Sequence, residues 1–180
     1  MNYYTADLHF GHANIIKLNN RPFSSVDQMD DTIITNWNKT VKPDDHVYII
    51  GDFAFRNNSE PKEYFDKLNG HKHLIIGNHD KAIQHDSNRR SYLDSMDQIK
   101  TIQDGNRTVV LCHYPLLEWD GMYRDTWHIF GHIHNNTNDT YTIMKQYRPK
   151  ALNAGVDITH FKPVTFDELI KLNEEFKKNH

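Results

Sequence analysis

Short apolar runs that stop abruptly at Asp, Asn or His residues are the feature that most limits how this chain can fold. The runs are rich in β-branched and aromatic residues and are bounded by glycine or polar residues, which is typical of buried β-strands. They cover residues 3–6, 47–50, 74–76, 109–112 and 129–130. We therefore expect several short strands, each followed at once by polar side chains.

Helical patterns lie between some of these runs. Ser25 with Gln28 predicts a capping box, Pro61 suits a first helical turn, and Thr165 with Glu168 predicts a second capping box before a C-terminal helix. The inward faces expected for these helices are Val26, Met29, Ile33 and Trp37, then Tyr64, Phe65 and Leu68, then Phe166, Leu169, Leu172 and Phe176.

Strands followed by helices predict an α/β fold, in which ligands gather beyond the carboxyl ends of the strands. The runs of the second half have little helix between them, so we expect a mixed rather than a purely parallel sheet system. The 180 residues contain no internal repeat, low-complexity tract or Pro/Gly/Ser-rich linker. This length and continuity predict a single domain over residues 1–180.

Composition narrows the class of protein. No run reaches transmembrane length, the start MNYYTADLHF lacks the plan of a signal peptide, and Cys112 is the only cysteine. These features predict a cytoplasmic protein without a membrane partner. The net charge of -3, from 21 basic and 24 acidic residues, disfavours a strongly electrostatic nucleic-acid binder. The 13 histidines indicate metal binding or proton transfer.

Polar clusters at the predicted strand ends hold nearly all the residues that could bind a metal. Each alone has an ordinary alternative, such as a turn, two polar residues on one strand face or a core histidine. Their recurrence in order, each at the mouth of a predicted strand, favours one shared site. The clusters are Asp7-Leu8-His9, Gly51-Asp52, Gly77-Asn78-His79-Asp80, His113 and Gly131-His132-Ile133-His134.

The spacing of these residues suits a metal centre. In an extended segment, residues two apart point to the same side, so we expect Asp7 and His9 to face one pocket, and His132 and His134 likewise. Nitrogen and carboxylate ligands without thiolate suit Mn²⁺, with Fe, Zn²⁺ or Ni²⁺ as alternatives. Seven candidates are too many for one tetrahedral site but suffice for two ions that share a carboxylate. They are Asp7, His9, Asp52, Asn78, His113, His132 and His134.

The ordered set D-x-H, G-D, G-N-H-D, H and G-H-x-H resembles the signature of the calcineurin-like metallophosphoesterase superfamily. The segments DLHFGHANII, CHYPLLEWDG, FGHIH and NAGVDI resemble its small bacterial and phage members. This resemblance implies a two-sheet α/β sandwich flanked by helices. It also implies the hydrolysis of phosphodiesters, phosphomonoesters or both.

The resemblance assigns a role to each residue. Asp7, His9 and His134 would hold one divalent ion, Asn78, His113 and His132 would hold the second, and Asp52 would bridge them. A hydroxide shared by the two ions would attack phosphorus. His79, oriented by Asp80, would donate a proton to the leaving group.

Residues around these clusters give weaker signals. His12 and Arg21 are candidates for contacting the substrate, Arg21 through its bidentate guanidinium. The alternatives are that His12 caps a turn and that Arg21 pairs with a surface carboxylate. Asp157 is expected to be structural, and Arg89 and Arg90 lie in a polar stretch predicted to be a solvated loop or a lid.

Other functions remain open at this point. The phosphate-ester substrate could be a nucleotide, and a nuclease is a second hypothesis that the lack of basic excess disfavours. A non-catalytic metal-binding scaffold is a third hypothesis, from another class. In such a scaffold we would expect ligand or acid–base positions to be lost, and His79, Asp80 and every ligand position are present. Composition and motifs leave the oligomeric state open.

Overall fold

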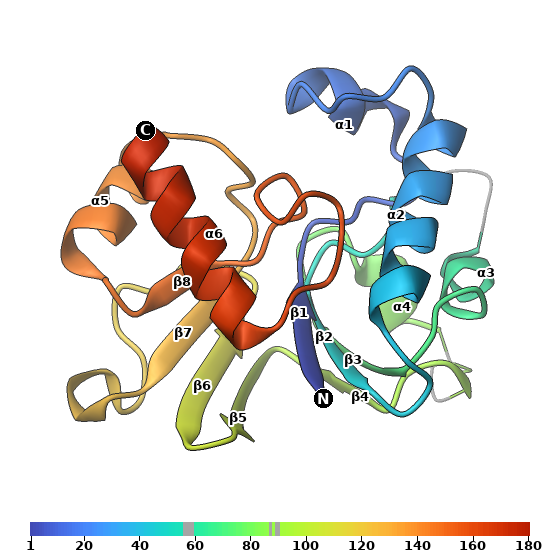
Figure 1. Cartoon of the computed structure of the whole chain (residues 1–180). Helices are drawn as coiled ribbons and strands as arrows, with labels where there is room; N and C mark the ends of the chain where they lie inside the picture. Colours follow the sequence, from blue (N-terminus) through green and yellow to red (C-terminus); the bar gives the residue numbers. More distant parts are fainter. Residues whose placement is uncertain (56–59, 87, 89–90) are drawn as a thin grey trace.

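Two four-stranded β-sheets carry the fold in this computed structural model, which describes residues 1–55, 60–86, 88 and 91–180 (Figure 1). The first sheet is parallel throughout, in the order β1 (Asn2–Thr5), β2 (His46–Ile50), β3 (His71–Ile75) and β4 (Ser95–Asp97). The second sheet is mixed, with β5 (Ile99–Asp104) antiparallel to β6 (Arg107–Cys112), followed by parallel β7 (Trp127–Phe130) and β8 (Ala151–Asn153).

Helices flank both sheets. The first half of the chain contributes α1 (Ala13–Leu18), α2 (Val26–Thr40), α3 (Pro61–Phe65) and α4 (Lys81–Gln84). The second half contributes the 3-10 turn η2 (Met122–Arg124), α5 (Asp139–Tyr147) and α6 (Phe166–Asn179). In Figure 1, α6 contacts both β8 and β1, so it covers one edge of the space between the sheets. The architecture is therefore a two-sheet α/β sandwich flanked by helices, as the resemblance implied.

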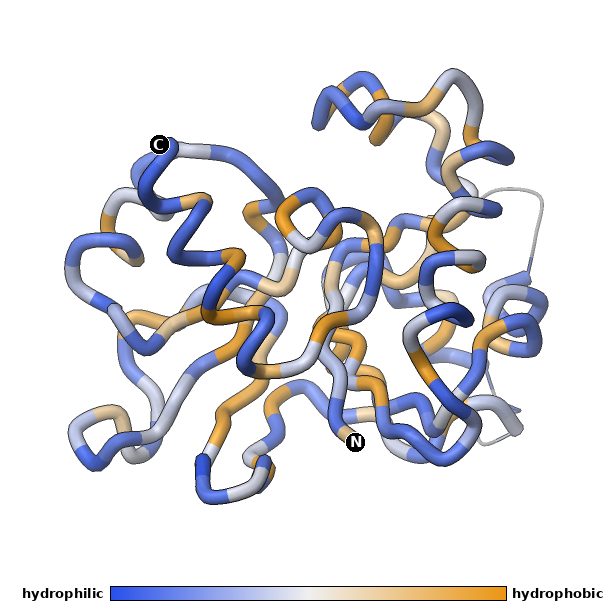
Figure 2. The backbone as a smooth tube through the Cα atoms, in the orientation of Figure 1, coloured by the Kyte–Doolittle hydropathy of each residue, from blue (hydrophilic) through white to orange (hydrophobic). Residues whose placement is uncertain are grey.

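Alternating side chains on the strands divide the core into three layers. On β1, Tyr3 packs toward α2 while Tyr4 points between the sheets. On β6, Val109 and Leu111 point between the sheets, and Val110 packs toward α5. Figure 2 shows the hydrophobic segments following the strands, with hydrophilic residues on the outer turns of α6. Burial on both faces explains why the strands read as short apolar runs rather than as an alternating pattern.

The five apolar runs all form strands, as predicted. Strands β4, β5 and β8 were not predicted, because β4 and β8 have three residues each and β5 is largely polar. The C-terminal capping box is present, with Thr165 and Glu168 bonded in both directions. The first box is only half correct: Ser25 caps Gln28, but the Gln28 side chain accepts from Ser24 instead of the Ser25 backbone.

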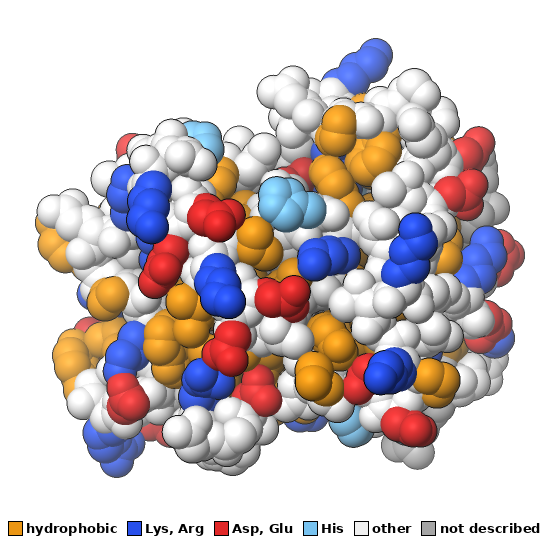
Figure 3. Space-filling model, viewed as in Figure 1, with side chains coloured by type: hydrophobic (Ala, Val, Ile, Leu, Met, Phe, Trp, Pro, Cys, Tyr) orange, Lys and Arg blue, Asp and Glu red, His pale blue; other side chains and the backbone are white. Residues whose placement is uncertain are grey.

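Charges are mixed over the face shown in Figure 3, where acidic and basic side chains alternate around α6. No helix in the described part of the chain combines the length and apolar character needed to cross a bilayer.

Candidate metal centre

The loops that follow β1, β2, β6 and β7 meet at one edge of the sandwich. Backbone hydrogen bonds join the loops after β1 and β2, from Asp7 N to the Gly51 carbonyl and from His9 N to the Asp52 carbonyl, both 3.0 Å. The loop after β7 is joined to the start of the loop after β6 by a 3.0 Å bond from Gly131 N to the His113 carbonyl. Loops from distant parts of the sequence are thus fixed against one another.

The backbone at five of the seven predicted ligand positions is left-handed rather than extended. Asp7 has φ 57°, His9 φ 55°, Asp52 φ 56°, His132 φ 70° and His134 φ 52°. The expectation that residues two apart converge because the segment is extended is therefore wrong. Asp7 and His9, and likewise His132 and His134, converge because the chain bends sharply at each of these alternate residues once the strand has ended.

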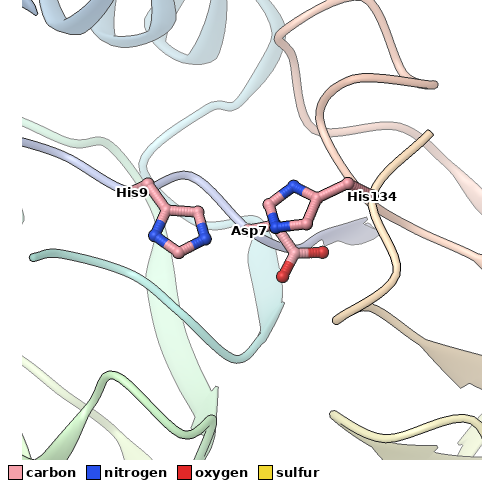
Figure 4. A group of neighbouring side chains, drawn as sticks. All are labelled: Asp7, His9 and His134. Carbon is pink, nitrogen blue, oxygen red and sulfur yellow. The ribbon is translucent and has the colours of Figure 1, made fainter. Parts of the chain in front are cut away.

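One group of possible metal ligands consists of Asp7, His9 and His134, all of them buried. One ligand atom from each lies within 4.8 Å of the others. In Figure 4 the His134 ring stands over the Asp7 carboxylate, and the His9 ring, on the same loop as Asp7, lies beside them. The rings of His9 and His134 are stacked with centroids 5.1 Å apart.

A second group consists of Asp7, Asp52 and His113, also buried and within the same limit. Asp52 Oδ2 lies 3.7 Å from His9 Nε2 and 3.5 Å from His113 Nε2, so this carboxylate stands between the two groups. The Asn78 amide oxygen lies 3.0 Å from His113 Nε2 and 3.1 Å from His132 Nδ1. All seven predicted ligands therefore meet at this edge of the fold.

The donor set fits divalent ions. His9 Nε2 is buried without a hydrogen-bond partner, which is costly for a polar atom unless something else binds it. His113 Nδ1 donates to the Ile50 carbonyl at 3.0 Å, and His134 Nδ1 faces Asp157 Oδ2 at 2.9 Å. When Nδ1 carries the proton, the lone pair is on Nε2, and such partners typically orient metal-binding histidines.

Burial and mutual attraction shift the pKa values of four residues of these groups in different directions. Burial raises the pKa of Asp7 to about 6 and lowers that of His9 to about 2. Burial opposes ionisation of Asp52 and His113 too, yet their mutual attraction outweighs it. The pKa of Asp52 falls to about 2, and that of His113 rises to about 9.

Two glycines give the ligands room. A Cβ on Gly77 would lie 2.3 Å from Asp52 Oδ1, and a Cβ on Gly131 would lie 2.7 Å from Asp7 Oδ2. Neither contact is compatible with a side chain. Gly131 thus lets the backbone before His132 pass close to the Asp7 carboxylate and the Ala6 side chain.

Asp80 does not orient the His79 ring, contrary to the predicted role. Its fully buried carboxylate accepts hydrogen bonds from the backbone N–H groups of Asp52, Phe53 and Gly77 at 2.7–2.9 Å. Asp80 therefore ties the loop after β3 to the loop after β2. The half-buried His79 donates its own backbone N–H to Asp52 Oδ1 at 2.9 Å.

His12 lies beside the ligand groups but does not cap α1 through its side chain. Its ring stacks on Phe55 with centroids 3.8 Å apart, and it lies 5.3 Å from the His9 ring and 6.4 Å from the His79 ring. His12 thus lies buried beside His9 and His79 at the border of the ligand groups.

The prediction that Arg21 contacts the substrate is wrong, because Arg21 is a buried structural residue. Its guanidinium donates to Asp157, to the carbonyls of Asp7 and Leu8 and to the Met29 sulfur. These contacts occupy all its N–H groups, so none is free for a phosphate. The carboxylate partner expected as the alternative is present, but it is buried rather than on the surface.

Two residues near the site were missed as functional candidates. Asp157 faces His134, and Asn153 Nδ2 donates to the His134 carbonyl at 2.7 Å. Asn153 ends β8, a strand too short for its polar terminus to stand out in the sequence. Arg89 and Arg90 lie outside the described residues.

Comparison with known proteins shows the family to which the chain belongs. No protein-family model matches it. It is 37% identical over 180 residues to the uncharacterized protein MJ1445 of Methanocaldococcus jannaschii, which covers 97% of this chain and 92% of that protein. The chain belongs to the MJ1445 family.

A crystal structure and a phage protein are also similar to this chain. The crystal structure of AQ665 from Aquifex aeolicus, a protein of unknown function, has a TM-score of 0.76 and 31% identity, over 96% of this chain and 98% of that one. The Gene 66 protein of Mycobacterium phage L5 is 24% identical over 86% of both chains. The MJ1445-family chain and the Aquifex protein thus share the complete two-sheet architecture.

Proposed function

We propose that the protein is a metal-dependent phosphoesterase of the calcineurin-like superfamily, of the small bacterial and phage type, with two divalent ions at the candidate metal centre. One observation carries the proposal: two buried ligand groups share Asp7, and the unpartnered His9 Nε2 points into the first of them. This donor set combines imidazole with carboxylate and contains no thiolate, which favours Mn²⁺, with Fe, Zn²⁺ or Ni²⁺ as alternatives.

The ligands divide between the two ions. Asp7, His9 and His134 would hold one, and Asn78, His113 and His132 would hold the other. Asp52 would bridge them, because its Oδ2 lies between His9 and His113. Two bound divalent ions would supply a net positive centre for phosphoryl oxygens and a water of lowered pKa.

His79 is the residue we propose as proton donor to the leaving group. Its half-buried ring lies 5.3 Å from the His9 ring and 5.4 Å from the Phe55 ring, at the border of the ligand groups. The His79 backbone N–H is held by Asp52, so the ring is carried at a fixed place beside the centre. A histidine with solvent access can reload its proton between turnovers.

We propose a small phosphate ester, such as a nucleotide, as the substrate. Asn78 is exposed and the Tyr114 ring, 46% exposed, lies 4.7 Å from the His132 ring, so the centre is approachable on this side. The charges of the face in Figure 3 are mixed and the net charge is -3, which gives no support to a nuclease. We further propose a reducing, cytoplasmic setting, because the single cysteine, Cys112, is buried and free.

The test is metal-dependent hydrolysis. Metal-stripped protein is given Mn²⁺, Zn²⁺, Ni²⁺, Fe²⁺ or Mg²⁺ singly and assayed with an aryl phosphomonoester and an aryl phosphodiester. We expect turnover that depends on the ion and is lost together with metal content in Asp52→Ala. Two bound ions without turnover on either substrate would instead support a non-catalytic metal-binding scaffold.

A further inference from the structure

Arg21 and Asp157 form a buried ion pair behind the candidate metal centre. Arg21 Nε donates to Asp157 Oδ1 at 2.8 Å, and Nη2 donates to Oδ2 at 3.0 Å. Their side chains are 0% and 2% exposed. The paired geometry is the bidentate fork that gives arginine–carboxylate pairs their strength and fixed orientation.

This pair contacts the backbone or side chains of one ligand group from two directions. Asp157 Oδ2 also lies 2.9 Å from His134 Nδ1. On the other side, the guanidinium donates to the Asp7 carbonyl at 2.7 Å and to the Leu8 carbonyl at 3.0 Å. Leu8 lies directly between Asp7 and His9 in sequence, so the pair braces the loop that carries two ligands and the ring of the third.

The other ligands are held by different partners. His113 Nδ1 donates to the Ile50 carbonyl, and Asn78 lies against His113 and His132. Within the described part of the chain, no hydrogen bond joins Arg21 or Asp157 to Asn78, His113 or His132. The bracing therefore reaches His134 and the loop of Asp7 and His9, and of these three residues only Asp7 also belongs to the second group.

We propose that Arg21 and Asp157 are a positioning pair that sets the affinity of the ion held by Asp7, His9 and His134, and leaves the other ion largely unaffected. The inference rests on the proposed metal centre. Asp157 fixes which nitrogen of His134 carries the proton and orients the ring, while Arg21 neutralises the buried carboxylate and holds the loop backbone.

The experiment measures metal affinity directly, without an activity assay. Metal-stripped wild-type protein, Asp157→Asn and Arg21→Lys are titrated with Mn²⁺ and with Zn²⁺ by calorimetry. Asp157→Asn keeps the shape of the side chain but removes its negative charge. Arg21→Lys keeps the positive charge but removes the bidentate geometry of the guanidinium. We expect one of the two ions to bind about 10- to 100-fold more weakly in each variant.

Single ligand deletions assign the affected ion. Asp157→Asn is combined with His132→Ala, which removes a ligand of the other ion, and separately with His9→Ala. In the His132→Ala protein, we expect Asp157→Asn to lower the affinity for the ion that still binds. In the His9→Ala protein, we expect Asp157→Asn to leave the affinity for the remaining ion unchanged. Asp104→Asn is the matched control, because Asp104 binds Asn2 and Tyr4 at the start of β1.

The outcomes separate this inference from the proposed function. Wild-type binding of two ions with unchanged affinity in folded Asp157→Asn and Arg21→Lys would overturn the inference alone. An equal loss of affinity for both ions would contradict the proposal that the pair acts on one ion only. If Asp157→Asn does not fold, Arg21→Lys decides the same question. Wild-type protein that binds no divalent ion would overturn the proposed function, and this inference with it.

Discussion

The carboxylate of Asp80 accepts a 2.9 Å hydrogen bond from the backbone N–H of Asp52, the residue we place between the two ions. The same carboxylate takes the N–H groups of Phe53 and Gly77. A single buried side chain thus fixes the relative position of two loops. Its role is to build the site rather than to assist His79.

We expect Asp80→Ala to lower the free energy of unfolding by about 3 kcal/mol or more, because three buried N–H groups lose their acceptor. Urea denaturation of the metal-stripped protein measures this loss. Asp94→Ala is the control, since Asp94 also accepts a backbone N–H, from Lys72, but is 43% exposed. A loss in Asp80→Ala no larger than in Asp94→Ala would contradict the bracing role.

Gly77→Ala should damage the site by steric contact alone. The added Cβ would lie 2.3 Å from Asp52 Oδ1 and 2.6 Å from Asp52 N, so the bridging carboxylate must move. We expect a loss of about 2 to 3 kcal/mol in stability and a clear drop in ion binding.

Gly105→Ala separates this steric effect from backbone strain. Gly105 has φ +61°, but a Cβ added there would meet no other atom within 4 Å, so we expect a cost of about 1 kcal/mol and normal ion binding. Ion binding that is equally normal in Gly77→Ala would show that Asp52 is not needed where the structure places it.

His79→Ala should lower turnover about 10²- to 10⁴-fold while both ions stay bound. The variant keeps the backbone N–H that Asp52 accepts, and the His79 ring belongs to neither ligand group. Turnover and metal content are measured on the same preparation, with exposed His85→Ala as the control. Loss of metal in parallel with turnover would make His79 a ligand instead of a proton donor.

Acid should destabilise the protein through His128, which lies away from the ligands. Burial lowers its pKa from 6.5 to about 4, although Nδ1 donates to the Val110 carbonyl and Nε2 accepts from Leu116 N. Between these pH values the unfolded chain binds a proton that the folded ring does not. The free energy of unfolding therefore falls as the pH is lowered from 6.5 toward 4, by up to roughly 3 kcal/mol.

Urea denaturation between pH 4 and 7, with chelator present, tests this dependence. We expect His128→Gln to be less stable than the wild type at pH 7 and to show a shallower decline in acid. An unchanged slope in His128→Gln would assign the acid sensitivity to other groups.

The strand ends were predictable because a strand buried on both faces has a simple sequence pattern, a continuous apolar run. A run such as Val47–Ile50 is apolar throughout and stops where Gly51 and Asp52 begin. Strand β4 has no such pattern, since Ser95 and Asp97 are polar and only half-buried. Its place in the sheet is set by pairing with β3, which is a property of the assembled fold.

The meeting of the ligands was predictable from their position after the strands, but the local geometry was not. Left-handed backbone at His132 and His134 is only weakly signalled by residue type, since histidine adopts it more often than most residues but far less often than glycine. Arg21 and Asp157 lie 136 positions apart, and nothing in the sequence indicates that they pair. Such a contact depends on how the sheets pack, so only the folded structure reveals it.

The left-handed backbone of the ligand loops has a thermodynamic consequence. Asp7, His9, Asp52, His132 and His134 each occupy a conformation that glycine adopts freely and that costs other residues on the order of 1 kcal/mol. A chain optimised for stability alone would place glycine at these positions. Backbone hydrogen bonds, such as those from Asp7 N to the Gly51 carbonyl and from His9 N to the Asp52 carbonyl, hold these loops bent, so binding of an ion would cost little free energy for ordering its ligands.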